Sequence, residues 1–108
     1  MTIRDKIKER LNAAPASFYV KEWDENIYCV PLSCGEMSKL QSKHSKFLSN
    51  LTGEAMVDLI ILKSLTKDGD KMFDLEDKPY LLRENMAVIS SVSAQILGAQ
   101  TSEDYEKN

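Results

Sequence analysis

Two cysteines and one histidine, Cys29, Cys34 and His44, are the side chains of this sequence best suited to nucleophilic or metal chemistry. A thiol beside a histidine base would form a nucleophilic pair, so an enzyme built on Cys34 and His44 is one interpretation. No glycine-rich oxyanion loop accompanies the pair, which favours a histidine at the edge of the core. Zinc needs about four ligands, and these residues supply three at most. We therefore expect free thiols that are buried or half-buried, no catalytic residue, no cofactor and no metal.

A run of acidic residues follows the middle of the chain: Asp68-Gly69-Asp70, then Asp74, Glu76 and Asp77. A calcium loop requires acidic ligands at its first, third and fifth positions and a glycine at the sixth. Counted from Asp68, the glycine comes second and Met72 takes the place of the third acidic ligand. A tight turn followed by helix caps accounts for every one of these acids, so the sequence predicts no calcium site.

Length and composition describe one small domain. The chain has 108 residues, of which 43% are hydrophobic and 29% charged, and this leaves no room for a second core. Its net charge of -3 argues against nucleic acid as a partner. No apolar segment approaches the ~20 residues of a membrane helix, and the charged first residues do not resemble a secretory signal. We expect no nucleic-acid, membrane or small-molecule partner and a cytoplasmic location.

The elements that position these residues begin with a helix and a hairpin. Thr2, with Asp5 three positions later, can cap a helix over 1–13. Alternating apolar and polar residues rich in β-branched and aromatic types predict a β-hairpin over 17–31. Its turn is expected at Asp24-Glu25-Asn26, because these polar residues separate the two apolar runs.

Two central helices follow. Ser33 and Glu36 have the spacing of a capping box, in which each side chain accepts a hydrogen bond from the backbone of the other residue. This signal predicts a helix that continues to about Ser49-Asn50. The next helix is expected from Glu54 to Leu65, and its apolar residues surround most of its circumference, which is typical of a central buried helix.

The last third of the chain is expected to contain a turn, a short helix and a final helix. The turn lies at 67–70, where a glycine can adopt a positive φ. Asp74 or Asp77 then caps a short helix with a proline in its first turn. A final helix is expected over 85–98, with a glycine as its natural stop, followed by a flexible acidic tail at 99–108.

These elements define an α+β fold class. We expect a mostly helical small domain with an N-terminal helix, a β-hairpin and three to four further helices. Residues 1–98 would form one globular domain, with 33–98 as its helical part.

Two surfaces are candidates for binding a partner. The apolar face of the last helix would accept an amphipathic helix of another protein, although the same face would serve equally to pack on the central helix, which the small core favours. A basic stripe on the second helix would suit an acidic partner segment, or would simply be solvated, the commoner case. An apolar face would also support self-association. The candidate residues are Met86, Ile89, Val92, Ile96 and Leu97 on the last helix and Lys39, Lys43 and Lys46 on the second.

The order of motifs along the chain resembles the tail assembly chaperones of long-tailed, siphovirus-type bacteriophages. In the first half the resemblance rests on a strand that ends at Trp23, a second strand that ends at Pro31-Leu32-Ser33, and a helix opened by Glu36. In the second half it rests on Lys67-Asp68-Gly69-Asp70 and Met72-Phe73-Asp74-Leu75-Glu76-Asp77 before a terminal helix. Together these motifs span residues 18–98.

The resemblance implies a non-enzymatic role in building a phage tail. Such a protein would bind the tape measure protein in the host bacterial cytoplasm, keep it soluble and help to recruit tail-tube subunits, and it would be absent from the mature virion. Family members are also made in a longer form by ribosomal slippage, and an adenine-rich run encoding Glu106-Lys107-Asn108 would suit such slippage. The alternative is a small phage-encoded adaptor or regulator that binds one folded host or phage protein.

Overall fold

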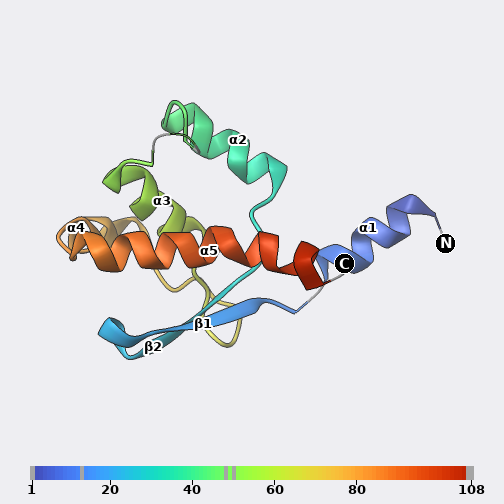
Figure 1. The fold of residues 1–108 in the computed structure, drawn as a ribbon, viewed down its shortest axis with the longest axis horizontal. Helices are drawn as coiled ribbons and strands as arrows, with labels where there is room; N and C mark the ends of the chain where they lie inside the picture. Colours follow the sequence, from blue (N-terminus) through green and yellow to red (C-terminus); the bar gives the residue numbers. More distant parts are fainter. Residues whose placement is uncertain (1, 13, 48, 50, 107–108) are drawn as a thin grey trace.

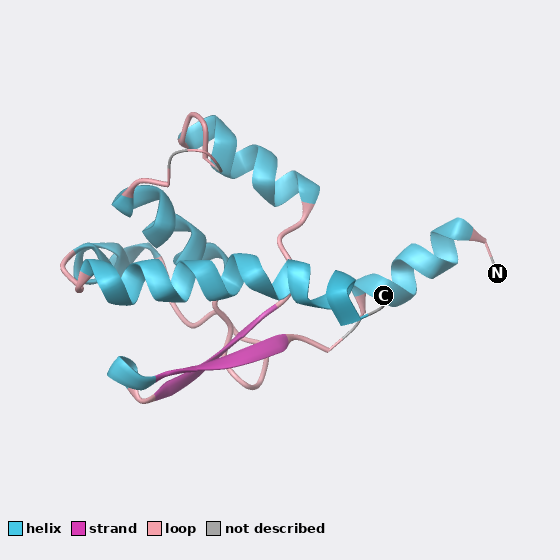
Figure 2. Cartoon of the chain, viewed as in Figure 1, coloured by secondary structure: helices cyan, strands magenta, loops and turns pink. Residues whose placement is uncertain are grey.

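A computed structural model of the chain describes residues 2–12, 14–47, 49 and 51–106. Within these residues it contains five α-helices and a two-stranded antiparallel hairpin, which confirms the predicted α+β class. In the view of Figure 1, α5 (Met86–Glu106) crosses the molecule with α3 (Gly53–Lys63) above it and the hairpin below, and it contacts both. Figure 2 shows how far helix predominates over strand.

The predicted hairpin is confirmed, but its connection lies earlier than expected. Strand β1 (Ala16–Val20) pairs with β2 (Glu25–Cys29), and Val20 lies opposite Glu25. A 3-10 turn, η1 (Lys21–Trp23), joins them together with Asp24, which adopts a left-handed φ of 48°. Asp tolerates this conformation, and its carboxylate accepts a hydrogen bond from the Tyr19 hydroxyl. The predicted turn residues Glu25 and Asn26 therefore belong to β2.

Helix α2 (Cys34–Lys43) begins as predicted and ends early. The Ser33 hydroxyl accepts from the Glu36 amide at 3.1 Å and Glu36 Oε1 accepts from the Ser33 amide at 2.9 Å, so the capping box is present. The expected continuation to Ser49 is wrong, because His44 is extended with a φ of -127°. From there the chain turns so that His44 reaches α3 and Phe47 enters the core.

Helix α3 is the central helix of the fold, as predicted. Thr52 caps its first turn, and most of its residues are buried. The expected end at Leu65 is wrong by two residues: Leu65 exchanges backbone hydrogen bonds with Tyr28 of β2, at 2.7 and 3.0 Å. This bridge satisfies polar backbone groups at the edge of β2, which explains why the chain leaves the helix there.

The segment between α3 and α5 follows the predicted turn chemistry. Gly69 has a φ of 88° in the expected turn. Asp74 caps the 3-10 turn η2 (Leu75–Asp77), and Asp77 Oδ2 accepts from the Asp74 amide in return. Helix α4 (Lys78–Leu82) follows with Pro79 in its first turn.

Helix α5 begins where predicted but does not stop at Gly98. Asn85 Oδ1 accepts from the Ala87 amide at the start of the helix. The helical backbone then continues to Glu106, so the expected stop is wrong. A glycine inside a helix costs only about 1 kcal/mol relative to alanine, which the rest of a long helix can offset. Residues 107 and 108 of the predicted tail lie outside the described residues.

The core lies where α3, α5 and the hairpin meet. Its fully buried side chains include Ile27 from β2, Leu59 and Ile60 from α3, and Ile96 from α5. By contrast, α1 (Ile3–Leu11) is capped by Thr2 as predicted but buries none of its residues. It extends away from the rest of the molecule in Figure 1.

Candidate partner-binding groove

The apolar face of α5 is part of the core and not a free surface. Ile89, Val92 and Ile96 are buried against α3 and the hairpin, and Leu97 is half-buried. Of the candidate residues on α5 only Met86 is exposed, at 58%. We therefore correct the interpretation that Ile89, Val92 and Ile96 bind a partner. A chain of this size needs these residues for its own core.

The predicted basic stripe is also interrupted. Lys39 and Lys43 are exposed one turn apart on α2, but Lys46 follows the end of the helix and has a left-handed φ of 58°. The three lysines therefore do not share one helical face. Instead, Lys39 and Lys43 border a groove whose third lysine, Lys71, comes from a distant part of the chain.

The groove lies between α2, α3 and the segment 71–75, and has a volume of about 380 Å³. Its apolar lining consists of Leu40, Ile61, Leu62 and Leu75. Leu40 and Ile61 form the buried floor, whereas Leu75 is 73% exposed. Such an exposed leucine beside an apolar groove is the feature that a partner's side chains would cover.

The rim of the groove is predominantly basic. Lys39, Lys43 and Lys71 line it together with two carboxylates, Asp58 and Asp74. Asp74 Oδ1 is engaged as the cap of η2, where it accepts from the Glu76 amide at 2.8 Å. Among the described residues Lys39 and Lys71 form no ion pair, so both ammonium groups are free for an acidic partner.

Asp58 is a charged centre in the lining of the groove. Its Oδ2 lies 2.6 Å from His44 Nε2 and 3.2 Å from Lys43 Nζ, and its Oδ1 lies 3.0 Å from Lys78 Nζ. Burial raises the pKa of Asp58, but hydrogen bonds from these three groups outweigh it and hold the pKa below its usual value. Since an ionised carboxylate only accepts, His44 Nε2 carries the proton in this contact. The network connects α2, α3 and α4 around one charge.

A second ion pair fixes the other end of α2 on α3. Lys63 Nζ is buried and lies 2.9 Å from Glu36 Oε1, the carboxylate that also caps α2. Burial raises the pKa of Glu36, and the bonds from Lys63 and Ser33 lower it further than burial raises it. The ion pair Glu36–Lys63 and the hydrogen bond between His44 and Asp58 therefore hold two of the walls of the groove together.

Among the described residues, no hydrogen bond joins His44 to either thiol. The imidazole is hydrogen-bonded to Asp58 instead. Cys29 is buried, as expected, and burial raises the pKa of its thiol despite the nearby Lys63 ammonium. Cys34 is exposed, so the expectation that both thiols are at least half-buried is wrong for this residue, which occupies the first turn of α2.

Several groove residues carried no signal in the sequence. Leu62, Lys71 and Leu75 belong to segments far from α2 along the chain, and only the packing of α2 on α3 brings them together.

Comparisons with protein-family models, with curated proteins and with solved structures find no match to this chain. In the part of the chain that the structure describes, no helix combines the length and apolar character needed to cross a membrane. The same described residues contain no group of three or more potential metal ligands.

Proposed function

We propose that the protein is a non-enzymatic chaperone that binds amphipathic helical segments of another chain in the groove between α2, α3 and 71–75. The observation that carries the proposal is the combination of an apolar floor, an exposed Leu75 and unpaired lysines at the rim. An amphipathic helix presents apolar side chains at intervals of three and four residues, and a groove of this kind receives them. Acidic residues flanking that apolar face would meet Lys39 and Lys71.

The partner that we propose is the tape measure protein of a long-tailed bacteriophage, as the resemblance to tail assembly chaperones implies. A long helical protein of this kind exposes apolar faces before the tail assembles around it. A chaperone must cover those faces and later be displaced, which suits a shallow groove better than a deep pocket. The protein would act in the host cytoplasm, help to recruit tail-tube subunits and be absent from the finished particle.

Co-expression with the tape measure protein of the same genome tests the proposal. The wild-type protein is expected to raise the soluble fraction of the tape measure protein, and Leu75→Asp is expected to abolish most of that gain. The substitution places a charge on the apolar lining, while the exposure of Leu75 leaves the fold intact. Soluble tape measure protein is quantified after centrifugation.

Leu11→Asp is the matched control, because Leu11 on α1 is 72% exposed and Leu75 is 73% exposed. It should retain the solubilising effect. Reversing the charge at Lys39 and Lys71 together should weaken binding and reduce its dependence on salt, since rim charges act mainly through long-range attraction. Equal loss in Leu75→Asp and Leu11→Asp, or no effect of the wild-type protein, would contradict the proposal.

A further inference from the structure

A second pocket, of about 270 Å³, lies between the hairpin connection and α4. Its lining residues are Trp23, Phe73, Asp77, Tyr80, Leu81 and Glu84. None of them lines the groove described above. The pocket therefore constitutes a separate surface feature whose chemistry differs from that of the groove.

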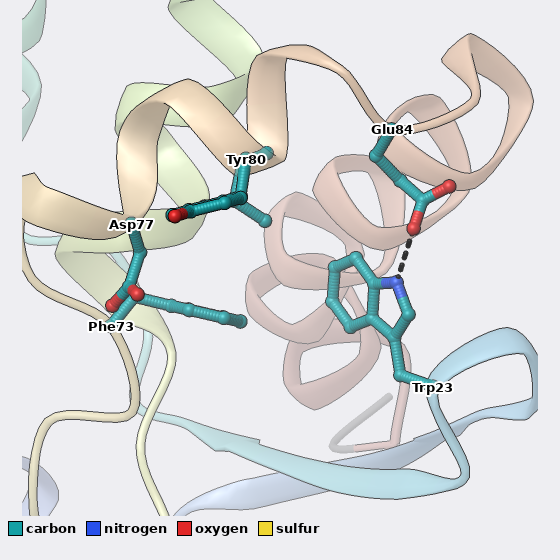
Figure 3. Close-up of a pocket in the computed structure, with 6 residues that line it drawn as sticks. Trp23, Phe73, Asp77, Tyr80 and Glu84 are labelled. Carbon is teal, nitrogen blue, oxygen red and sulfur yellow. Dashed lines mark hydrogen bonds between the residues drawn. The ribbon is translucent and has the colours of Figure 1, made fainter.

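Three aromatic rings form its walls. The Trp23 and Phe73 rings are 5.9 Å apart between centroids and meet edge to face at 73°. Figure 3 shows the ring of Phe73 directed toward the Trp23 indole, whereas the ring of Tyr80 extends toward the side of Asp77. Tyr80 is 71% exposed, although a tyrosine ring usually covers apolar surface. The faces of such rings carry partial negative charge and attract cations.

Two carboxylates flank the rings, as Figure 3 also shows. Glu84 Oε2 accepts from Trp23 Nε1 at 2.8 Å and Oε1 accepts from the Asn85 amide at 2.7 Å. The bond from Trp23 and the bond from the Asn85 amide lower the pKa of Glu84, so it is ionised at neutral pH. Asp77 Oδ2 accepts from the Asp74 amide at 2.9 Å. Each carboxylate oxygen has a second lone pair, which leaves acceptor capacity toward the pocket.

No cation of the protein itself neutralises this site. The lining contains neither lysine nor arginine, and among the described residues Asp77 and Glu84 take part in no ion pair. Two cations are adjacent to these carboxylates along the chain, Lys78 and Arg83. Lys78 is engaged with Glu54 and Asp58 instead, and among the described residues Arg83 forms no ion pair with Glu84 or Asp77. Aromatic faces and two uncompensated carboxylates together define a site for a positively charged group.

We infer that this pocket binds the guanidinium group of an arginine side chain supplied by a partner polypeptide. Binding sites for whole small molecules usually enclose about 300–1,000 Å³, so this pocket suits one side chain. A guanidinium is planar, stacks on aromatic rings and donates to carboxylates through several N–H groups at once. A lysine ammonium is a compact and strongly hydrated charge, and it gains less from the ring faces. The site is therefore selective for arginine over lysine.

Titration of the full chain with N-acetyl-arginine-amide at constant ionic strength tests the inference. Trp23 is the only tryptophan, so its fluorescence and its indole N–H resonance report on this pocket alone. We expect saturable changes with half-saturation at about 10 mM, the range for one weak side-chain contact. N-acetyl-citrulline-amide, which has the same shape without the charge, should bind at least about fivefold more weakly, and the lysine analogue should lie between the two.

Variants assign the response to the pocket. Asp77→Asn retains an oxygen that accepts from the Asp74 amide but removes one negative charge. Tyr80→Ala removes one exposed aromatic wall of the pocket. Each substitution should weaken binding of the arginine probe about threefold or more. Tyr80→Phe retains the ring and should bind like the wild type. Asp68→Asn is the matched charge control, because Asp68 is exposed in the turn at 67–70 and outside the pocket. Circular dichroism verifies that each variant is folded.

Absence of saturation up to about 100 mM would overturn the inference. Equal affinities for the arginine, lysine and citrulline probes would do the same, as would unchanged binding in both Asp77→Asn and Tyr80→Ala. This test is independent of the proposed function, because it uses no tape measure protein and no groove residue. A failed titration leaves the solubilisation experiment unaffected, and the reverse also holds.

Discussion

At the scale of single residues, Asp58 is the most constrained charge of the described chain. It is largely buried, and His44, Lys43 and Lys78 surround it within 3.2 Å. Removing one member of a buried charged cluster leaves the others desolvated without a partner, which costs more than the cluster itself contributes. Of the three contacts, the one to Lys43 should matter least, because that side chain is 54% exposed and solvent screens it.

The lowered pKa of Asp58 predicts a dependence of stability on pH. Because its pKa is depressed in the folded state, the ionised group stabilises the fold fully above the unfolded pKa of about 3.9. That contribution is lost as the pH falls through the folded pKa. Asp58→Asn should reduce the free energy of unfolding by about 1–3 kcal/mol at pH 7, and the difference from wild type should shrink below about pH 4.

Urea denaturation of both proteins between pH 7 and pH 3 provides the measurement. Asp70→Asn is a suitable control, because Asp70 is exposed and forms no ion pair among the described residues. A stability difference between wild type and Asp58→Asn that is constant over this range would show that the charge of Asp58 is not the cause.

At the scale of elements, α1 and α2 begin with the same kind of cap but differ in how they attach to the core. Both helices begin with a capping box, Thr2 with Asp5 and Ser33 with Glu36. Only α2 extends its cap into the tertiary structure, because Glu36 also contacts the buried Lys63 of α3. A cap contributes about 1 kcal/mol to a helix, whereas attachment to the core determines whether the helix supports the whole fold.

Removal of residues 1–13 should therefore leave the stability of the remaining chain nearly unchanged. No residue of α1 is buried, and its apolar stripe of Ile3, Ile7 and Leu11 is exposed at 72%, 51% and 72%. We expect a change in the free energy of unfolding within about 0.5 kcal/mol. Thermal unfolding followed by circular dichroism provides the measurement, and a large loss of stability would mean that α1 packs on the body of the protein in solution.

At the scale of the whole molecule, the packing of α5 on α3 decides what surface remains for binding. The hydrophobic residues of α5 that face α3 complete the core, so the partner surface that we propose is the groove that α2 and 71–75 border on α3. A small protein can bury only a limited apolar surface, and here α5 contributes buried side chains that cover the central helix.

Truncation of α5 side chains tests this division between core and surface. Ile96→Ala should destabilise the fold by about 2–5 kcal/mol, because Ile96 is fully buried and its loss leaves a cavity. Met86→Ala, on the same helix but 58% exposed, should change stability by less than about 1 kcal/mol. Equal effects of the two substitutions in chemical denaturation would place the face of α5 outside the core.

Local interactions are the part of this fold that the sequence determines by itself. The capping pair Ser33–Glu36, a cap at Asp74 or Asp77, the positive φ of Gly69 and the apolar circumference of α3 were all predictable. Each depends on residues within a few positions of one another, so the pattern of types along the chain is sufficient. The class of fold follows from the same signals.

Tertiary structure alone decided where helices end and which surfaces face solvent. Helix α2 stops at Lys43 because His44 contacts Asp58 and Phe47 enters the core, and α5 continues past Gly98. The groove and the aromatic pocket each combine residues that are far apart along the chain, such as Trp23 and Glu84, which are 61 positions apart. Such contacts depend on how elements pack, and the free energy of that packing is not encoded in any short stretch of sequence.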